Sequence, residues 1–224
     1  MSPAPSPAPA AAPLLVLLAL AAARGAAAAD FQLTNVVLLR VGDGTGSSLT
    51  ARAAPVYLDE VYPAYAAAQG RVSSRLVAGA TLPANDFTMG TAQLSADGAF
   101  ATFGAIAAPV NSTSPTPCTA AGSCFPGVAR VLARVAWDGS VSTATTVDPA
   151  SWSGLIKGAC SVDGSSYFVV GNSSTIGLGW KAHGSGTAPL ISQYAAASQF
   201  VSCAVGATSK SLYIVRTTGT FGEL

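Results

Sequence analysis

From Phe31 onward, hydrophobic residues occur in short runs that end at Gly, Asp, Asn or Pro, and a helical repeat is almost absent. Typical runs are NVVLLRVGDG, GRVSSRLVAG, AQLSADGAFATFGAIA, VARVLARVAWDGSVSTATTV, IKGACSVDGSSYFVVGN and FVSCAVGATSKSLYIVRTTG. Runs of about four to eight β-favouring residues between turn formers predict strands. The one helical candidate, Pro63 to Gly70, is too short to persist alone. The pattern therefore predicts an all-β chain.

A hairpin motif recurs along this pattern. The unit S-x-D-G, followed by an apolar or aromatic run, begins at Ser95 and again at Ser161, and a degenerate copy starts at Cys203. A two-residue Asp-Gly loop suits a type I′ turn, and Asp also bonds its own backbone in turns. Turn formation thus explains all the Asp-Gly pairs with one cause, without catalysis. The predicted turn residues are Asp97, Gly98, Asp138, Gly139, Asp163 and Gly164.

Repetition of short strands at intervals of roughly 40 to 50 residues is typical of a β-propeller. We expect a propeller-like domain over residues 30–224, with a Cys- and Pro-rich insertion at about 108–127. The chain holds about four such units, which predicts an incomplete ring. A β-sandwich with evenly spaced hairpins is the alternative fold.

The same segments resemble a group of secreted β-propeller repeat proteins, found largely in bacteria and mostly uncharacterised. The likeness covers Phe31 to about Gly179 and is carried by the first five segments quoted above together with the stretch GTGSSLTARAAPVYLDEVYPA. The resemblance implies a propeller fold and export, and it supplies no catalytic residues. The Cys-bearing insertion departs from the pattern of the group.

The N-terminal segment has the features of a secretory signal. An apolar run extends from Leu14 to Ala23, and three alanines precede Asp30. This run is too short to span a membrane and resembles an h-region with an A-x-A cleavage site. We predict that residues 1–29 are removed between Ala29 and Asp30, and an uncleaved anchor is the alternative. The mature chain is then expected to be extracellular, without a membrane segment.

Charge gives little information about a ligand. Only 9% of residues are charged, and the formal net charge is +1. Nucleic-acid binding needs clustered Lys and Arg, which this sequence lacks. Nucleic acid is therefore not expected as a partner.

The cysteines are even in number and all follow the predicted cleavage site, which in a secreted protein favours disulfides. Four cysteines allow three connectivities. We predict Cys118–Cys124, which would close a short loop in the insertion, and Cys160–Cys203, which occupy matching positions in successive repeats. The sequons NST at Asn111 and NSS at Asn172 predict glycosylation in turn-rich stretches.

No catalytic, cofactor or metal site is predicted. The single histidine, His183, lies in the Gly-rich segment KAHGSG and is expected to be a solvated loop residue. Asp59 and Glu60 are adjacent in a strand, so they should point to opposite faces, with one solvated and one near a strand edge. Of the three tryptophans, Trp152 is expected to be the most exposed.

These observations favour a secreted, non-catalytic binding or scaffold domain, acting on an extracellular protein, matrix or cell-wall polysaccharide. The alternatives are an extracellular carbohydrate-active hydrolase or lyase, and the N-terminal fragment of a longer propeller protein. Convergence of several acidic or His side chains on one face would favour the enzyme.

Overall fold

The computed structural model describes residues 15–19, 31, 35–44, 52–62, 71–83, 89–114, 125–172, 177–186, 191–194, 200–208, 211–216 and 222–223. Every regular element in these ranges is a β-strand, and all strand pairings are antiparallel, so the predicted all-β class is confirmed. The described residues contain no helix long and apolar enough to cross a membrane. The short helical candidate at 63–70 lies outside them.

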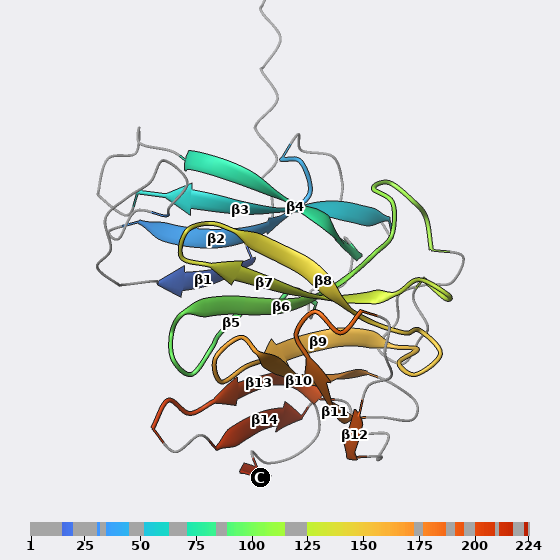
Figure 1. Cartoon of the computed structure of the whole chain (residues 1–224). Helices are drawn as coiled ribbons and strands as arrows, with labels where there is room; N and C mark the ends of the chain where they lie inside the picture. Colours follow the sequence, from blue (N-terminus) through green and yellow to red (C-terminus); the bar gives the residue numbers. More distant parts are fainter. Residues whose placement is uncertain are drawn as a thin grey trace, which may run out of the picture.

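The strands form four meander units in chain order (Figure 1). The first unit contains β1 (Leu15–Ala19), β2 (Val36–Val41), β3 (Ala53–Val61) and β4 (Arg71–Pro83). The second contains β5 (Gln93–Leu94), β6 (Phe100–Ile106), β7 (Arg130–Ala136) and β8 (Val141–Val147). The third contains β9 (Leu155–Cys160), β10 (Ser166–Asn172), β11 (Leu178–Ala182) and β12 (Ile191–Tyr194). The fourth contains β13 (Phe200–Val205), β14 (Leu212–Arg216) and β15 (Gly222–Glu223).

Within each unit, neighbouring strands in the sequence are neighbours in the sheet. A single residue pair, Thr81 with Ile106, joins the first unit to the second, so that their strands form one eight-stranded sheet. Strand β1 falls inside the segment predicted to be a signal peptide and pairs with the edge of β2. Cleavage after Ala29 stays a prediction, because one short apolar run can serve both as an h-region and as an edge strand.

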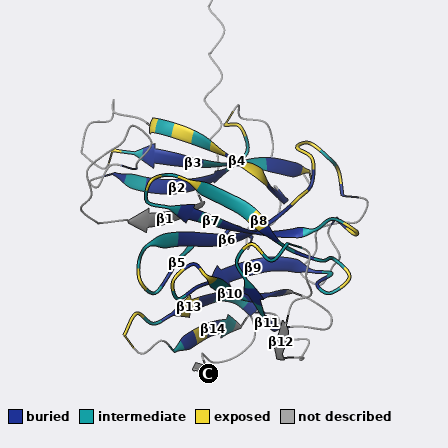
Figure 2. Cartoon of the chain, in the orientation of Figure 1, coloured by how far each residue is buried: buried dark blue, intermediate teal, exposed yellow. Residues whose placement is uncertain are grey.

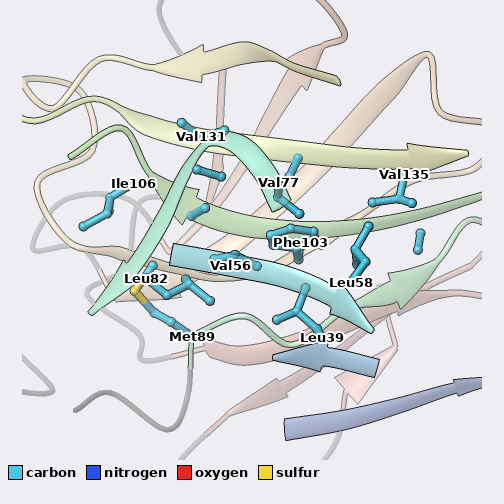
Figure 3. Packing of buried hydrophobic residues seen from close by; sticks show 14 of the residues in the cluster. Leu39, Val56, Leu58, Val77, Leu82, Met89, Phe103, Ile106, Val131 and Val135 are labelled. Carbon is cyan, nitrogen blue, oxygen red and sulfur yellow. The ribbon is translucent and has the colours of Figure 1, made fainter. Parts of the chain in front are cut away.

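Apolar clusters lie between successive units. Figure 2 colours the buried residues of the strands dark blue. The largest lies between the first two units, where Leu39, Val56 and Phe103 pack together (Figure 3). A second cluster around Trp152, Ile156 and Tyr167 joins the second unit to the third. A third joins the third unit to the fourth. Burying each large apolar side chain contributes about 1.5–3 kcal/mol, so these clusters hold the stack together.

Polar and covalent links reinforce the last three units. Thr102 on β6 donates its hydroxyl proton to the carbonyl of Ala159 on β9. A disulfide joins Cys160 on β9 to Cys203 on β13, with Cα atoms 6.0 Å apart. This is the pairing expected from the repeat register. Disulfides are typical of proteins outside the reducing cytoplasm. Cys118 and Cys124 lie outside the described residues.

The Asp-Gly hairpins form, but their predicted type I′ geometry is wrong. Among the described residues, positive φ outside glycine occurs at Asn111 and Phe125, so Asp97, Asp138 and Asp163 keep ordinary φ angles. The following glycines take φ of 72°, 73° and 78°. The loops hold three or four residues, as at Ala136, whose N–H donates to the carbonyl of Ser140. Longer loops of this kind place only the glycine in the left-handed region.

Candidate functional site between the second and third units

His183 lies just after β11, where its backbone N–H donates to the carbonyl of Ser165 at 2.8 Å. Its ring Nδ1 is 2.6 Å from the hydroxyl of Tyr167 on β10 and 3.2 Å from that of Thr145 on β8. The Tyr167 and Thr145 side chains are fully buried, and the His183 ring is half-buried. His183 thus lies in a turn, as expected, but its ring is only partly exposed and is bonded to side chains of the sheet. The turn after β11 places His183 beside Ser165, just before β10, and so brings the imidazole against the sheet.

The hydrogen bonds identify the tautomer of this histidine. A buried phenol needs an acceptor, and Nδ1 of His183 is the partner that the hydroxyl of Tyr167 contacts. The Thr145 oxygen accepts a bond from the N–H of Gly184 at 2.8 Å and lies 3.2 Å from Nδ1, farther than the phenol oxygen. Because Nδ1 accepts, the proton of the neutral ring resides on Nε2.

The electrostatic surroundings keep both groups neutral. Burial lowers the pKa of His183, and the positive charge of Arg134 lowers it further. Burial raises the pKa of Tyr167 to about 12, with Arg134 and the bond to Thr145 acting in the opposite direction. At neutral pH the cluster is therefore an uncharged imidazole bonded to a protonated phenol. It presents one Nε2–H donor on a partly exposed ring.

Arg134 borders this cluster on β7. Its guanidinium stacks on the Phe100 ring, 4.6 Å from the centroid, and donates to the carbonyl of Gly164 at 3.0 Å. The cation is thus fixed between the second unit and the hairpin of the third. Together, His183 and Arg134 place hydrogen-bond donors at this junction, which suits recognition of oxygen acceptors.

Asp59 and Glu60 do point to opposite faces, but both are buried, so the expected solvated position is wrong. Asp59 accepts a bond from Arg40 at 2.6 Å and from Ser74 at 2.6 Å. Glu60 accepts bonds from Asn35 and Ser73, each at 2.9 Å. Strand register aligns these partners across β2, β3 and β4. The pair therefore stabilises the first sheet on both of its faces.

The turn carboxylates also have structural partners. Asp97 accepts from the Ser95 hydroxyl at 2.5 Å and from the N–H of Ala99 at 3.0 Å. Asp138 accepts from the N–H of Ser140, and hydrogen bonding to the Ser140 side chain first, and to its backbone second, lowers the pKa of Asp138. Asp163 accepts from the N–H and hydroxyl of Ser165. Within the described ranges, no group of three or more His, Cys, Asp and Glu side chains gathers as metal ligands would.

Two buried side chains were missed in the sequence. Arg130, fully buried, donates to the carbonyls of Gly154, Ser153, Phe125 and Val128, and burial lowers its pKa to about 10. Arg130 thereby links the C-terminal end of the insertion, near Phe125, to the segment just before β9 of the third unit. Trp152 is fully buried, so its expected exposure is wrong. The local sequence DPASWSGL reads as a loop, and the covering residues come from β7, β8 and β9.

The two sequons occupy different settings. Asn111 is exposed in a turn, with φ of 67°, as an acceptor of a glycan should be. Asn172 is the last residue of β10 and pairs with Leu155, and the rest of its sequon lies outside the described residues. Glycosylation of both stays a prediction.

Comparison with known proteins identifies no family. No family model and no curated protein matches the chain. A solved structure that it matches is TolB from Acinetobacter baumannii, at 12% identity and a TM-score of 0.23, over 85% of this chain and 51% of that one. The chain thus spans about half the length of that structure, and a likeness at this level carries no argument about fold or activity.

Proposed function

We propose that this chain is an extracellular binding or scaffold domain, built as about four blades of a β-propeller. Its ligand would be a matrix or cell-wall polysaccharide or an extracellular protein. The four meander units, stacked in chain order, support the blade assignment. The Cys160–Cys203 disulfide supports a location outside the cytoplasm.

One observation carries the choice of binding over catalysis. The acceptor nitrogen of His183 is occupied by the phenol of Tyr167, which burial keeps protonated. A general base must offer a free acceptor to the proton that it removes. What His183 offers instead is a donor, next to the fixed guanidinium of Arg134. Donors of this kind bind the hydroxyl and carbonyl oxygens of sugars and peptides.

The test compares binding and turnover on the same material. The secreted protein is run through native gels containing individual matrix or cell-wall polysaccharides, and the same mixtures are assayed for new reducing ends and unsaturated products. We expect retardation by at least one polysaccharide, loss of retardation in Arg134→Gln, and no product. Product that accumulates with time and disappears in His183→Gln would overturn the proposal.

The competing candidate is a hydrolase or lyase acting through the same pair. The 2.6 Å contact between Tyr167 and His183 favours it, because phenol and imidazole are both proton-transfer groups. Tyr167→Phe separates the two. It would abolish turnover in an enzyme, and in a binding domain it would leave retardation within about twofold of the native protein, since the buried phenol does not reach the ligand.

A further inference from the structure

Each unit has one sheet face toward the preceding unit and one toward the following unit. In the third unit, Tyr167 and Val169 pack toward the second unit, and the alternate residues Phe168 and Val170 pack toward the fourth. The stack of units therefore has a direction, with a different kind of sheet face at each of its two ends. Its two ends are the preceding-side face of the first unit and the following-side face of the fourth, seen at opposite ends of Figure 1.

The end face of the first unit carries exposed apolar side chains. Val56, Leu58 and Val77 point into the core shared with the second unit. The opposite face holds Leu76, paired with Tyr57 across β3 and β4, and Val72 two positions beyond Ser74. Val72 is 55% exposed and Leu76 is 54% exposed. Large apolar side chains grouped on one sheet face mark an interaction surface.

The end face of the fourth unit is its counterpart. Leu212 and Ile214 on β14 pack against the third unit. The residue between them, Tyr213, points to the other face with its cross-strand partner Ala204 and is 43% exposed. An aromatic side chain next to a small one offers a flat apolar surface, as interface cores do.

We propose that the end face of the first unit binds the end face of the fourth unit of a second copy of this chain. The repeat pattern indicates this occupant. At both junctions from the second unit to the fourth, a following-side face packs on a preceding-side face. In the part of the chain that the structure describes, the end faces of the first and fourth units have these same two orientations, so they are matched to each other. Only 9% of residues are charged, so electrostatic repulsion between copies is small.

A contact between two different faces is heterologous, and it makes a chain of copies or a closed ring. The test is sedimentation velocity of the secreted protein over a concentration series, with Leu76→Asp, Tyr213→Asp and, as a matched control, Val110→Asp. Val110 is 50% exposed beside the Asn111 turn and lies outside the strands that form the two end faces. We expect association of the native protein, weakened about tenfold or more by each end-face variant, since a buried unpaired carboxylate is costly. Val110→Asp should associate as the native protein does.

The decisive experiment mixes the two end-face variants. Leu76→Asp keeps an intact fourth-unit face, and Tyr213→Asp keeps an intact first-unit face. Their equimolar mixture should regain dimers, which neither variant forms alone. A monomeric native protein at every concentration, equal weakening by Val110→Asp, or a mixture that stays monomeric would overturn the proposal. The three positions are at least two-fifths exposed, so each variant should have a melting temperature close to that of the native protein. If Leu76→Asp melts at a clearly lower temperature, Val72→Asp takes its place in the experiment.

Discussion

The hydroxyl of Tyr167 donates to Nδ1 of His183 at 2.6 Å, so the one histidine of the chain is bonded through its acceptor nitrogen. Protonation of His183 would place the second proton of the ring on Nδ1 and face it toward the phenol. The contact is thus made by the neutral ring, and its strength depends on pH.

We predict that this contact makes the fold less stable in mild acid. Burial lowers the pKa of His183 below its ordinary value of about 6.5, so the unfolded chain binds the proton more readily. The stabilisation is therefore complete above about pH 6.5 and is lost as the pH falls through the lower pKa of the folded state. Thermal melts between about pH 7 and pH 5 should show a steeper loss in the native protein than in His183→Gln. An equal loss of melting temperature with pH in both proteins would contradict the bond between Tyr167 and the neutral His183 ring.

The disulfide between the third and fourth units should contribute strongly to stability. Its cysteines are 43 residues apart, and closing a loop of that length in the unfolded chain is worth about 4 kcal/mol. Replacing Cys160 and Cys203 together by Ser should lower the free energy of unfolding by about that amount, measured by denaturant titration. Cys118→Ser with Cys124→Ser is the matched control, expected to cost about 2 kcal/mol if those residues close their shorter loop.

Peptide mapping without reductant checks the pairing itself. A peptide that joins Cys118 or Cys124 to Cys160 or Cys203 would contradict both the pairing and the repeat alignment.

Two glycines should respond differently to a methyl group. A Cβ at Gly104 would lie 2.4 Å from the Ile156 side chain and 2.6 Å from its carbonyl oxygen, at the close approach of β6 and β9. A Cβ at Gly98 meets nothing within 4 Å, and only its φ of +72° opposes substitution. We expect Gly98→Ala to cost about 1 kcal/mol and Gly104→Ala about 3 kcal/mol. Chemical denaturation of both variants checks the order, and a more damaging Gly98→Ala would contradict the packing.

At the same hairpin, Asp97→Asn should change the free energy of unfolding by less than about 0.5 kcal/mol, because an amide oxygen can accept the same bonds. A large loss in this variant would mean that the negative charge of Asp97 has a role beyond the turn.

The N-terminus of the exported protein should be Asp30. The apolar run before it and the three alanines predict cleavage after Ala29. N-terminal sequencing of protein from the culture medium checks this. Recovery of the chain from Met1 in the cytosol would contradict both cleavage and export, and recovery from Met1 at the membrane would support an uncleaved anchor.

Local pattern by itself determined the strands, the hairpin positions and one disulfide. Alternating apolar residues between Gly and Asp suffice for a strand, and equal spacing of Cys160 and Cys203 in successive repeats suffices for their pairing. The turn geometry was decided by tertiary structure, because the register of the paired strands determines how many residues the loop contains.

Burial was likewise decided only by the tertiary structure. Trp152 and His183 occupy segments that read as loops, and their neighbours come from other strands, Leu132 and Val147 around the indole and Thr145 and Tyr167 around the imidazole. Asp59 and Glu60 can be buried because Arg40 and Asn35 donate hydrogen bonds to them. Residues far apart in the chain create these environments, so no window of sequence contains them. The sequence determined the strands, and the packing of one unit on the next determined what each side chain meets.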